Sequence, residues 1–223
     1  MNKVSVIVPT YNRPEMLKRA LKSVAEQTYQ NIEIIVINDG GVDVSDVVNQ
    51  FENVVYISKQ ENKGLPAARN TGIRLATGKY ITYLDDDDII YPHSVETMVN
   101  ALDNNPEKLV YTRWHKWINE EIKAESVNQL YTKNRLLRHN IAPVHCIMHH
   151  KDLLDDRMFD ESLPNHEDYD LWLWLSDKTD FRQINVITGA YSIRQGSDQM
   201  SLKASHIDGF HLVRNRYLKH HGY

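Results

Sequence analysis

The stretch GKYITYLDDDD, residues 78–88, joins a short apolar run to four consecutive aspartates. The run from Tyr80 to Leu84 predicts a buried strand, and Gly78 ends the helical pattern before it. Carboxylates crowded this closely repel one another unless a cation or water screens their charge. A solvated helix start is the alternative, because Asp also favours helix N-termini. We therefore expect a strand that carries an acidic, cation-binding segment at its carboxyl end.

Three further apolar runs precede this strand, and a helical pattern follows each of the four. The expected strands are residues 4–8, 32–37, 54–57 and 80–84, and the expected helices are residues 16–24, 44–51, 65–76 and 92–102. Nearly continuous apolar strands between helices indicate an α/β fold with a mostly parallel central sheet flanked by helices. Beyond about residue 111 the pattern weakens, and we expect strands near 109–112 and 188–193 and a helix over 169–175.

Polar clusters lie at three of the expected strand ends. They are Pro9 to Tyr11, Asn38 with Asp39, and the acidic run Asp85 to Asp88. Ligands of open parallel sheets bind beyond the carboxyl ends of the strands, so these clusters predict one site at that edge. Hard oxygen ligands select Mg²⁺ or Mn²⁺, which proteins usually hold with one or two carboxylates plus substrate phosphates.

Composition narrows the class of protein. The 223 residues are 41% hydrophobic, which is enough for one core, and 26 basic against 30 acidic side chains leave no basic stripe for nucleic acid. The single Cys146 forms no internal disulfide, so we expect a cytoplasmic protein. No apolar run reaches the length of a membrane span. Peripheral membrane contact through basic and aromatic residues 111–138 stays open.

Five segments, in this order along the chain, resemble the family 2 inverting glycosyltransferases with the GT-A fold. They are residues 4–13, 37–40, 62–70, 78–88 and 161–172. The resemblance implies a metal-dependent hexosyl- or N-acetylhexosaminyltransferase that moves a single sugar from a nucleoside diphosphate sugar, expected to be a UDP-sugar. The implied acceptor is a saccharide or lipid-linked molecule of surface polysaccharide or glycoconjugate biosynthesis. Residues 1–110 would form the nucleotide-sugar-binding half, and residues 111–223 the acceptor-binding half with a C-terminal extension.

The resemblance also implies the residues that bind the nucleotide. Pro9, Thr10 and Tyr11 would line the base and ribose, and Asp39 would accept the hydrogen of the base N3. An ionised carboxylate only accepts hydrogen bonds, so Asp39 leaves uridine and deoxythymidine undistinguished. A simple turn residue before a glycine is the other interpretation of Asp39. Arg69 would lie near the base or phosphates, with an ordinary surface arginine as the alternative.

The acidic run matches the family's Asp-x-Asp-Asp pattern, so the resemblance gives Asp87 the metal. Asp85 or Asp86 would contact the ribose or a metal-bound water. Asp168 is the implied catalytic base, with Glu167 beside it, and capping of the following helix is the alternative role for this acidic pair.

The resemblance extends to the C-terminal side, where Arg194 would reach the diphosphate. Gln195 and Gly196 depart from the pattern, because a histidine frequently stands there. A homodimer is a further implication of the family.

Other classes fit less well. Residues 9–14 contain no glycine, whereas a dinucleotide-binding oxidoreductase needs a glycine-rich turn after its first strand, and the chain has no phosphate-loop motif. A sugar nucleotidyltransferase and a catalytically idle nucleotide-sugar-binding protein of the same fold remain as alternatives.

Overall fold

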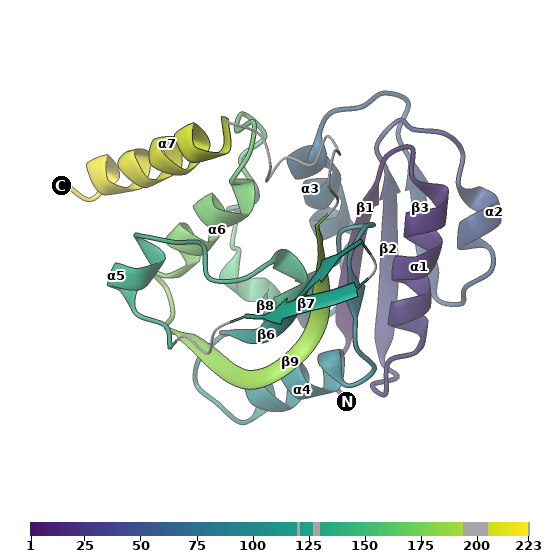
Figure 1. The fold of residues 1–223 in the computed structure, drawn as a ribbon, viewed down its shortest axis with the longest axis horizontal. Helices are drawn as coiled ribbons and strands as arrows, with labels where there is room; N and C mark the ends of the chain where they lie inside the picture. Colours follow the sequence, from purple (N-terminus) through teal and green to yellow (C-terminus); the bar gives the residue numbers. More distant parts are fainter. Residues whose placement is uncertain (120, 127–129, 194–204, 223) are drawn as a thin grey trace.

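The computed structural model describes residues 1–119, 121–126, 130–193 and 205–222. Figure 1 shows helices on both sides of a central sheet. The elements in chain order are β1 (Val4–Thr10), α1 (Pro14–Ala25), β2 (Ile32–Asn38), α2 (Ser45–Val48), β3 (Val54–Ser58), α3 (Leu65–Leu75), β4 (Tyr80–Tyr83), β5 (Ile89–Ile90), α4 (Ser94–Asp103), β6 (Leu109–Ile118), β7 (Glu121–Glu125), α5 (Lys133–Leu136), the 3₁₀ helix η1 (Val144–Cys146), β8 (Ile147–His150), the 3₁₀ helix η2 (Lys151–Leu153), α6 (Glu167–Leu175), β9 (Phe181–Ile193) and α7 (Ser205–His220).

Within these ranges nine strands form one sheet, which runs through both halves of the chain. Its order is β3-β2-β1-β4-β8-β6-β9-β5, with β7 paired to β6. The first four strands are mutually parallel, whereas β8 pairs antiparallel with both β4 and β6. The predicted α/β fold is confirmed, and the carboxyl ends of β1, β2 and β4 meet at one edge of the sheet.

Strand periodicity gives the sheet two apolar faces. Alternate residues of β1 point to opposite sides, so Val4, Val6 and Val8 pack with α1 and α4, while Ile7 packs with α3. The second face is also covered by α6, whose Trp172 is fully buried. Because both faces are covered, the polar loops beyond the strand ends are left as the place for a ligand.

The C-terminal half departs most from the expected elements. β6 and β9 are far longer than predicted, and β9 sweeps around the end of the sheet as a long curved strand (Figure 1). β5, β7, β8, α5 and α7 were not predicted. All five residues of β7 are exposed, so its sequence carries no alternation of buried and exposed positions.

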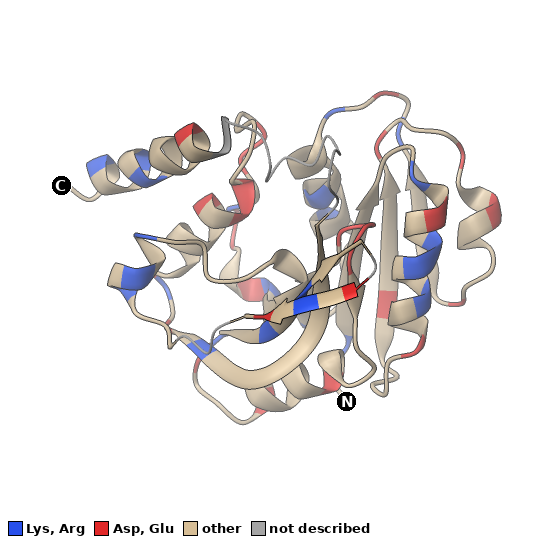
Figure 2. Ribbon diagram, in the orientation of Figure 1, with Lys and Arg blue, Asp and Glu red and all other residues tan. Residues whose placement is uncertain are grey.

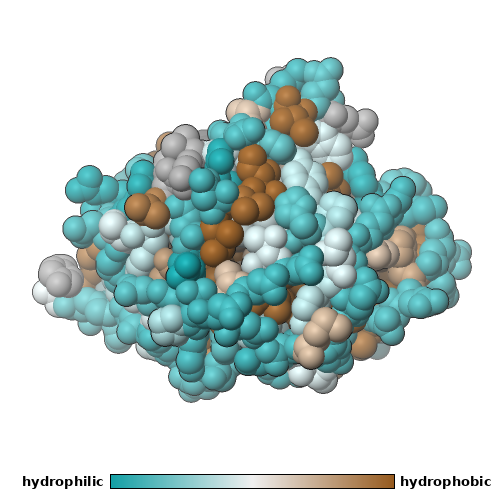
Figure 3. Space-filling model, turned by 90° about the horizontal axis from the view of Figure 1, so that it is seen from below, coloured by the Kyte–Doolittle hydropathy of each residue, from teal (hydrophilic) through white to brown (hydrophobic). Residues whose placement is uncertain are grey.

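The surface carries dispersed charge. Figure 2 shows lysines and arginines interspersed with acidic residues along the helices and loops. Figure 3 shows a mostly hydrophilic face with a band of apolar residues across its middle.

None of the helices in the described ranges combines the length and the apolar character needed to cross a membrane.

A buried carboxylate ties the amino-terminal ends of the central strands together. Glu33 lies beside Ser5 in the parallel register of β1 and β2, and it accepts hydrogen bonds from the Ser5 hydroxyl at 2.5 Å and the Thr77 backbone at 2.6 Å. Lys3 lies 2.5 Å from its other oxygen. Burial opposes ionisation, but the contacts with Lys3, Ser5 and Thr77 outweigh it and lower the pKa of Glu33 to about 2.

This lowered pKa predicts an acid-sensitive contribution to stability. A carboxylate whose folded pKa lies below its unfolded value stabilises the fold above the unfolded value, and this stabilisation is lost as the pH falls toward about 2. Between neutral pH and about pH 2, the free energy of unfolding should fall by roughly 2 kcal/mol more in the wild type than in Glu33→Gln. Urea denaturation of both proteins measures the difference. Glu52→Gln, at an exposed position, should follow the wild type, and parallel pH curves for Glu33→Gln and wild type would rule the interaction out.

Candidate active site

The acidic run lies where β4 leaves the sheet beside β1. The parallel register pairs Ile7 with Tyr83, and the Leu84 amide donates to the Ile7 carbonyl at 2.9 Å. The Thr10 hydroxyl, at the end of β1, therefore reaches the Asp86 carboxylate at 2.8 Å. The ends of β1 and β4 therefore lie side by side, as the sequence predicts, and their role as one site stays a prediction.

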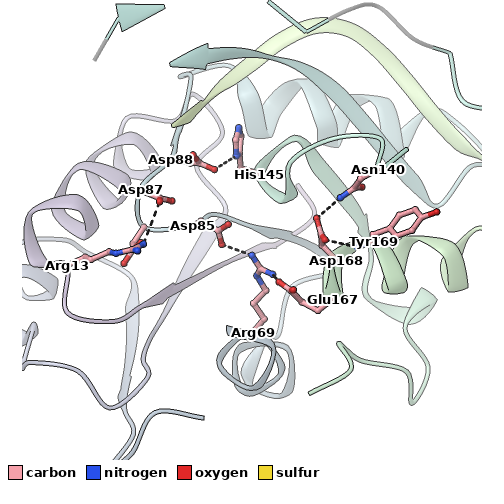
Figure 4. Close-up of polar contacts among 11 residues, drawn as sticks. Arg13, Arg69, Asp85, Asp87, Asp88, Asn140, His145, Glu167, Asp168 and Tyr169 are labelled. Carbon is pink, nitrogen blue, oxygen red and sulfur yellow. Dashed lines mark hydrogen bonds and ion pairs between the residues drawn. The ribbon is translucent and has the colours of Figure 1, made fainter. Parts of the chain in front are cut away.

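Arg13, which precedes α1, supplies positive charge to the same cluster. Its Nη1 atom lies 3.2 Å from Asp86 Oδ1 and 3.5 Å from Asp87 Oδ2. Figure 4 shows Arg13 reaching toward Asp87 from the side opposite Arg69. Sequence reasoning missed Arg13, although an arginine at the end of the first polar loop, two residues after Tyr11, was a signal for a charge at this edge.

The electrostatics of Asp87 suit a cation site. Burial, followed by the charges of Asp88, Asp85 and Asp86, raises the pKa of Asp87 to about 7, against the opposing effect of Arg13. A carboxylate under this like-charge repulsion gains most from a nearby cation. Among the described residues, no group of three or more ligand side chains converges into a ready metal site. An ion beside Asp87 would therefore need substrate phosphates as ligands in addition to one or two of these carboxylates.

Asp88 is turned away from the other three aspartates and bound within the fold. His145 Nδ1 lies 2.9 Å from Asp88 Oδ2, and the Ser192 amide donates to Asp88 Oδ1 at 2.7 Å. Both members of the Asp88–His145 pair are fully buried (Figure 4). His149, on β8, is fully buried as well.

Asp39 organises the loop that covers the end of β2. Its carboxylate accepts hydrogen bonds from Lys59 Nζ at 2.8 Å, the Lys63 amide at 3.1 Å and the Gly64 amide at 2.7 Å. The next residue, Gly40, has a φ of +76° and packs so closely on residues 61–62 that a Cβ would clash with their backbone. Asp39 is thus more than a turn residue, because it fixes the position of the loop that leads into α3.

Arg69 connects the acidic run to the second acidic pair. It lies on α3, is 1% exposed, and contacts Asp85 Oδ1 at 2.6 Å and Glu167 Oε1 at 2.5 Å (Figure 4). Burial alone would lower the pKa of Arg69, but Asp85 and Glu167 outweigh it and raise that pKa. The alternative of an ordinary surface arginine is therefore wrong.

Glu167 and Asp168 begin α6 and have different surroundings. Glu167 is 4% exposed, and its burial raises its pKa despite the opposing charge of Arg69. Asp168 is partly exposed, accepts the Tyr169 amide at 2.7 Å through Oδ1, and accepts Asn140 Nδ2 at 2.7 Å through Oδ2. The more accessible Asp168 is thus the one of the two that a substrate hydroxyl can approach.

The structure brings most of the predicted site residues to one edge of the sheet. Contacts with Thr10 and Arg13 hold Asp86 and Asp87 in one group. Arg69 joins Asp85 to Glu167 in a second group beside it. Pro9 is buried at the end of β1, and Tyr11 beside it is 45% exposed. Arg194 lies outside the described residues.

Comparison with known proteins identifies the family. Residues 5–161 match the family model described as glycosyl transferase family 2. The chain therefore belongs to this family. An uncharacterised glycosyltransferase of Rickettsia prowazekii is 34% identical over 182 residues, which are 76% of this chain and 57% of the relative. The minor teichoic acid biosynthesis protein GgaB of Bacillus subtilis is 29% identical over 212 residues, which are 88% of this chain and 24% of that protein.

Solved structures share the GT-A fold. S. aureus TarS in complex with UDP-GlcNAc superposes with a TM-score of 0.77 at 20% identity, covering 95% of this chain and 65% of that one. The mannosyltransferase PcManGT from Pyrobaculum calidifontis, in complex with GDP-Man and Mn²⁺, gives a TM-score of 0.70 at 17% identity over 88% of this chain and 58% of that one.

The chain spans only part of the sequence relatives that it matches, little more than half of the Rickettsia protein and about a quarter of the Bacillus one.

Loss of the Arg69 charge should destabilise the fold more than loss of another arginine on the same helix. Arg69→Gln leaves the buried Glu167 without its cation, so we expect a loss of about 3 kcal/mol in unfolding free energy. Arg74→Gln removes an exposed arginine of α3 and should change this quantity by less than about 0.5 kcal/mol. Denaturant titration measures both variants. Equal losses in the two variants would show that the buried ion pairs of Arg69 do not stabilise the fold.

Proposed function

We propose that this chain transfers a single sugar, with inversion and with the help of a divalent metal, from a UDP-sugar to a saccharide or lipid-linked acceptor. The observation that carries the proposal is the bridge from Asp85 through Arg69 to Glu167. This bridge joins the acidic run after β4 to the start of α6. The acidic run, proposed to bind the donor, therefore lies on one side of the Arg69 guanidinium, and the partly exposed carboxylate of Asp168 lies on the other.

Nucleotide recognition is assigned to the ends of β1 and β2. Asp39 accepts the N3 hydrogen of a uracil, and its existing bonds to Lys59 and to the Lys63 and Gly64 amides hold the carboxylate in place for that contact. Pro9, Thr10 and Tyr11 line the base and ribose, with the exposed Tyr11 ring on the open side. The bound TarS relative supports a uridine nucleotide in this fold.

Asp87 is the proposed metal ligand, for Mn²⁺ or Mg²⁺. When bound, such an ion supplies positive charge that stabilises the departing diphosphate. Asp86 is fixed by Thr10 and Arg13 and contacts the ribose or a metal-bound water, together with Asp85. Asp88 takes no part, because its two oxygens are committed to His145 and Ser192. The Mn²⁺ bound to the mannosyltransferase of the same fold supports this assignment.

Asp168 is the proposed base for inversion. The acceptor hydroxyl oxygen forms a bond to the anomeric carbon, the bond from that carbon to the diphosphate oxygen breaks, and the hydroxyl proton passes to Asp168. Glu167 stays bound to Arg69 and orients the start of α6. The resemblance to the GgaB protein supports an acceptor in surface polysaccharide synthesis. A cytoplasmic location, contact with the membrane surface and a homodimer are further parts of the proposal.

The role of Asp168 separates binding from chemistry. Asp168→Asn keeps the size of the side chain and one of its two acceptor oxygens, so we expect the dissociation constant for UDP with Mn²⁺ to stay within about twofold. Loss of a general base should slow release of UDP from UDP-GlcNAc, with water as acceptor, by about 10²- to 10⁴-fold. Calorimetry and a UDP-release assay test the two expectations. Wild-type turnover in Asp168→Asn would remove Asp168 from the mechanism, and absence of UDP release by the wild type would overturn the proposed donor.

A further inference from the structure

Asn140 touches the proposed base from a segment that carries no sequence motif. The segment lies between α5 and η1, and Asn140 Nδ2 is 2.7 Å from Asp168 Oδ2. Figure 4 shows Asn140 and Asp168 pointing toward each other on the side of Asp168 away from Arg69. We propose that Asn140 is a positioning residue, which orients the Asp168 carboxylate for proton transfer. The inference rests on the proposed function, because it presupposes that Asp168 is the base.

The orientation of the Asn140 amide follows from its second contact. The Ile141 backbone N–H donates to the other end of the side chain at 2.9 Å. A backbone N–H only donates, so the atom that it meets must be the amide oxygen. The amino end of the amide therefore faces Asp168, and the contact is a hydrogen bond from a neutral donor to a carboxylate.

Asp168 is consequently held at both oxygens. The Tyr169 amide fixes Oδ1 at 2.7 Å, and Asn140 fixes Oδ2 at 2.7 Å. Each carboxylate oxygen has a second lone pair, so both contacts leave room for the proton of an acceptor hydroxyl. Two donors at opposite ends prevent rotation of the carboxylate, which a base needs if it is to meet a hydroxyl in one defined geometry.

The segment that carries Asn140 is itself anchored in the core. Leu136, Ala142 and Val144 are buried in the same apolar cluster as α6, and Ile141 packs against that cluster. The donor is therefore presented from a fixed support. Mere stabilisation of this segment is the competing role for Asn140, and a suitable pair of substitutions separates the two.

Asn140→Asp and Asn140→Ala distinguish a donor from a spacer. Aspartate has the shape of asparagine and can still accept the Ile141 N–H, but it presents a carboxylate oxygen to Asp168 in place of a donor. We expect the rate of UDP release from UDP-GlcNAc in Mn²⁺ to fall about tenfold in Asn140→Ala and about 100-fold in Asn140→Asp. The dissociation constant for UDP should stay within about twofold in both. Asn104→Asp places the same charge at an exposed position and should leave both quantities unchanged.

A double-mutant cycle provides the second measurement. In the Asp168→Asn background, Asn140→Ala should cause no further loss of rate, because the carboxylate that it orients is gone. Thermal unfolding of each variant verifies that it is folded. If Asn140→Asp were as active as the wild type, or if the losses in the cycle were additive, the positioning role of Asn140 would be overturned. The proposed function would stay in place in either case. Wild-type turnover in Asp168→Asn would instead overturn the base itself and the role of Asn140 with it.

Discussion

The guanidinium of Arg69 lies in a site that is 1% exposed, between Asp85 at 2.6 Å and Glu167 at 2.5 Å. A charge buried this deeply persists only where opposite charges and hydrogen bonds compensate the loss of water. The two carboxylates come from segments far apart in the chain, at the end of β4 and at the start of α6. Arg69 therefore sets the distance between the end of β4 and the start of α6. The roles proposed for Asp87 and Asp168 both depend on that distance.

Four adjacent aspartates would repel one another if they shared one environment, and the fold places them against several different partners. Asp85 is bound by Arg69, Asp86 by Thr10 and Arg13, and Asp88 by His145. Asp87, which Arg13 also contacts at 3.5 Å, has a pKa that burial and the neighbouring aspartates raise to about 7. This raised pKa supports the metal role proposed for Asp87. The different partners of the four aspartates could not be predicted from four identical sequence letters.

The parallel half of the fold could be predicted from sequence because its strands are apolar along their whole length and its turns follow at once. Val4–Thr10 and Ile32–Asn38 are buried over nearly every residue, which leaves a clear pattern. The acidic run and Asp39 could be predicted because they lie at strand ends of that half. β7 and the start of β9 could not, because many of their residues are exposed and their positions depend on pairing with β6. The contact between Asn140 and Asp168 could not be predicted either, because it depends on the tertiary packing of two distant segments.

The proposed reaction requires that the chain bind a uridine nucleotide together with a divalent metal, and calorimetric titration measures this binding. UDP, dTDP, GDP and NAD would each be titrated with Mn²⁺ and again with a chelator, on the wild type and on Asp87→Asn, with the exposed Asp46→Asn as the matched control. We predict that UDP binds in the presence of Mn²⁺, that the chelator removes this binding, and that Asp87→Asn weakens it while Asp46→Asn does not. Metal-independent binding of UDP, or binding of NAD alone, would contradict the account.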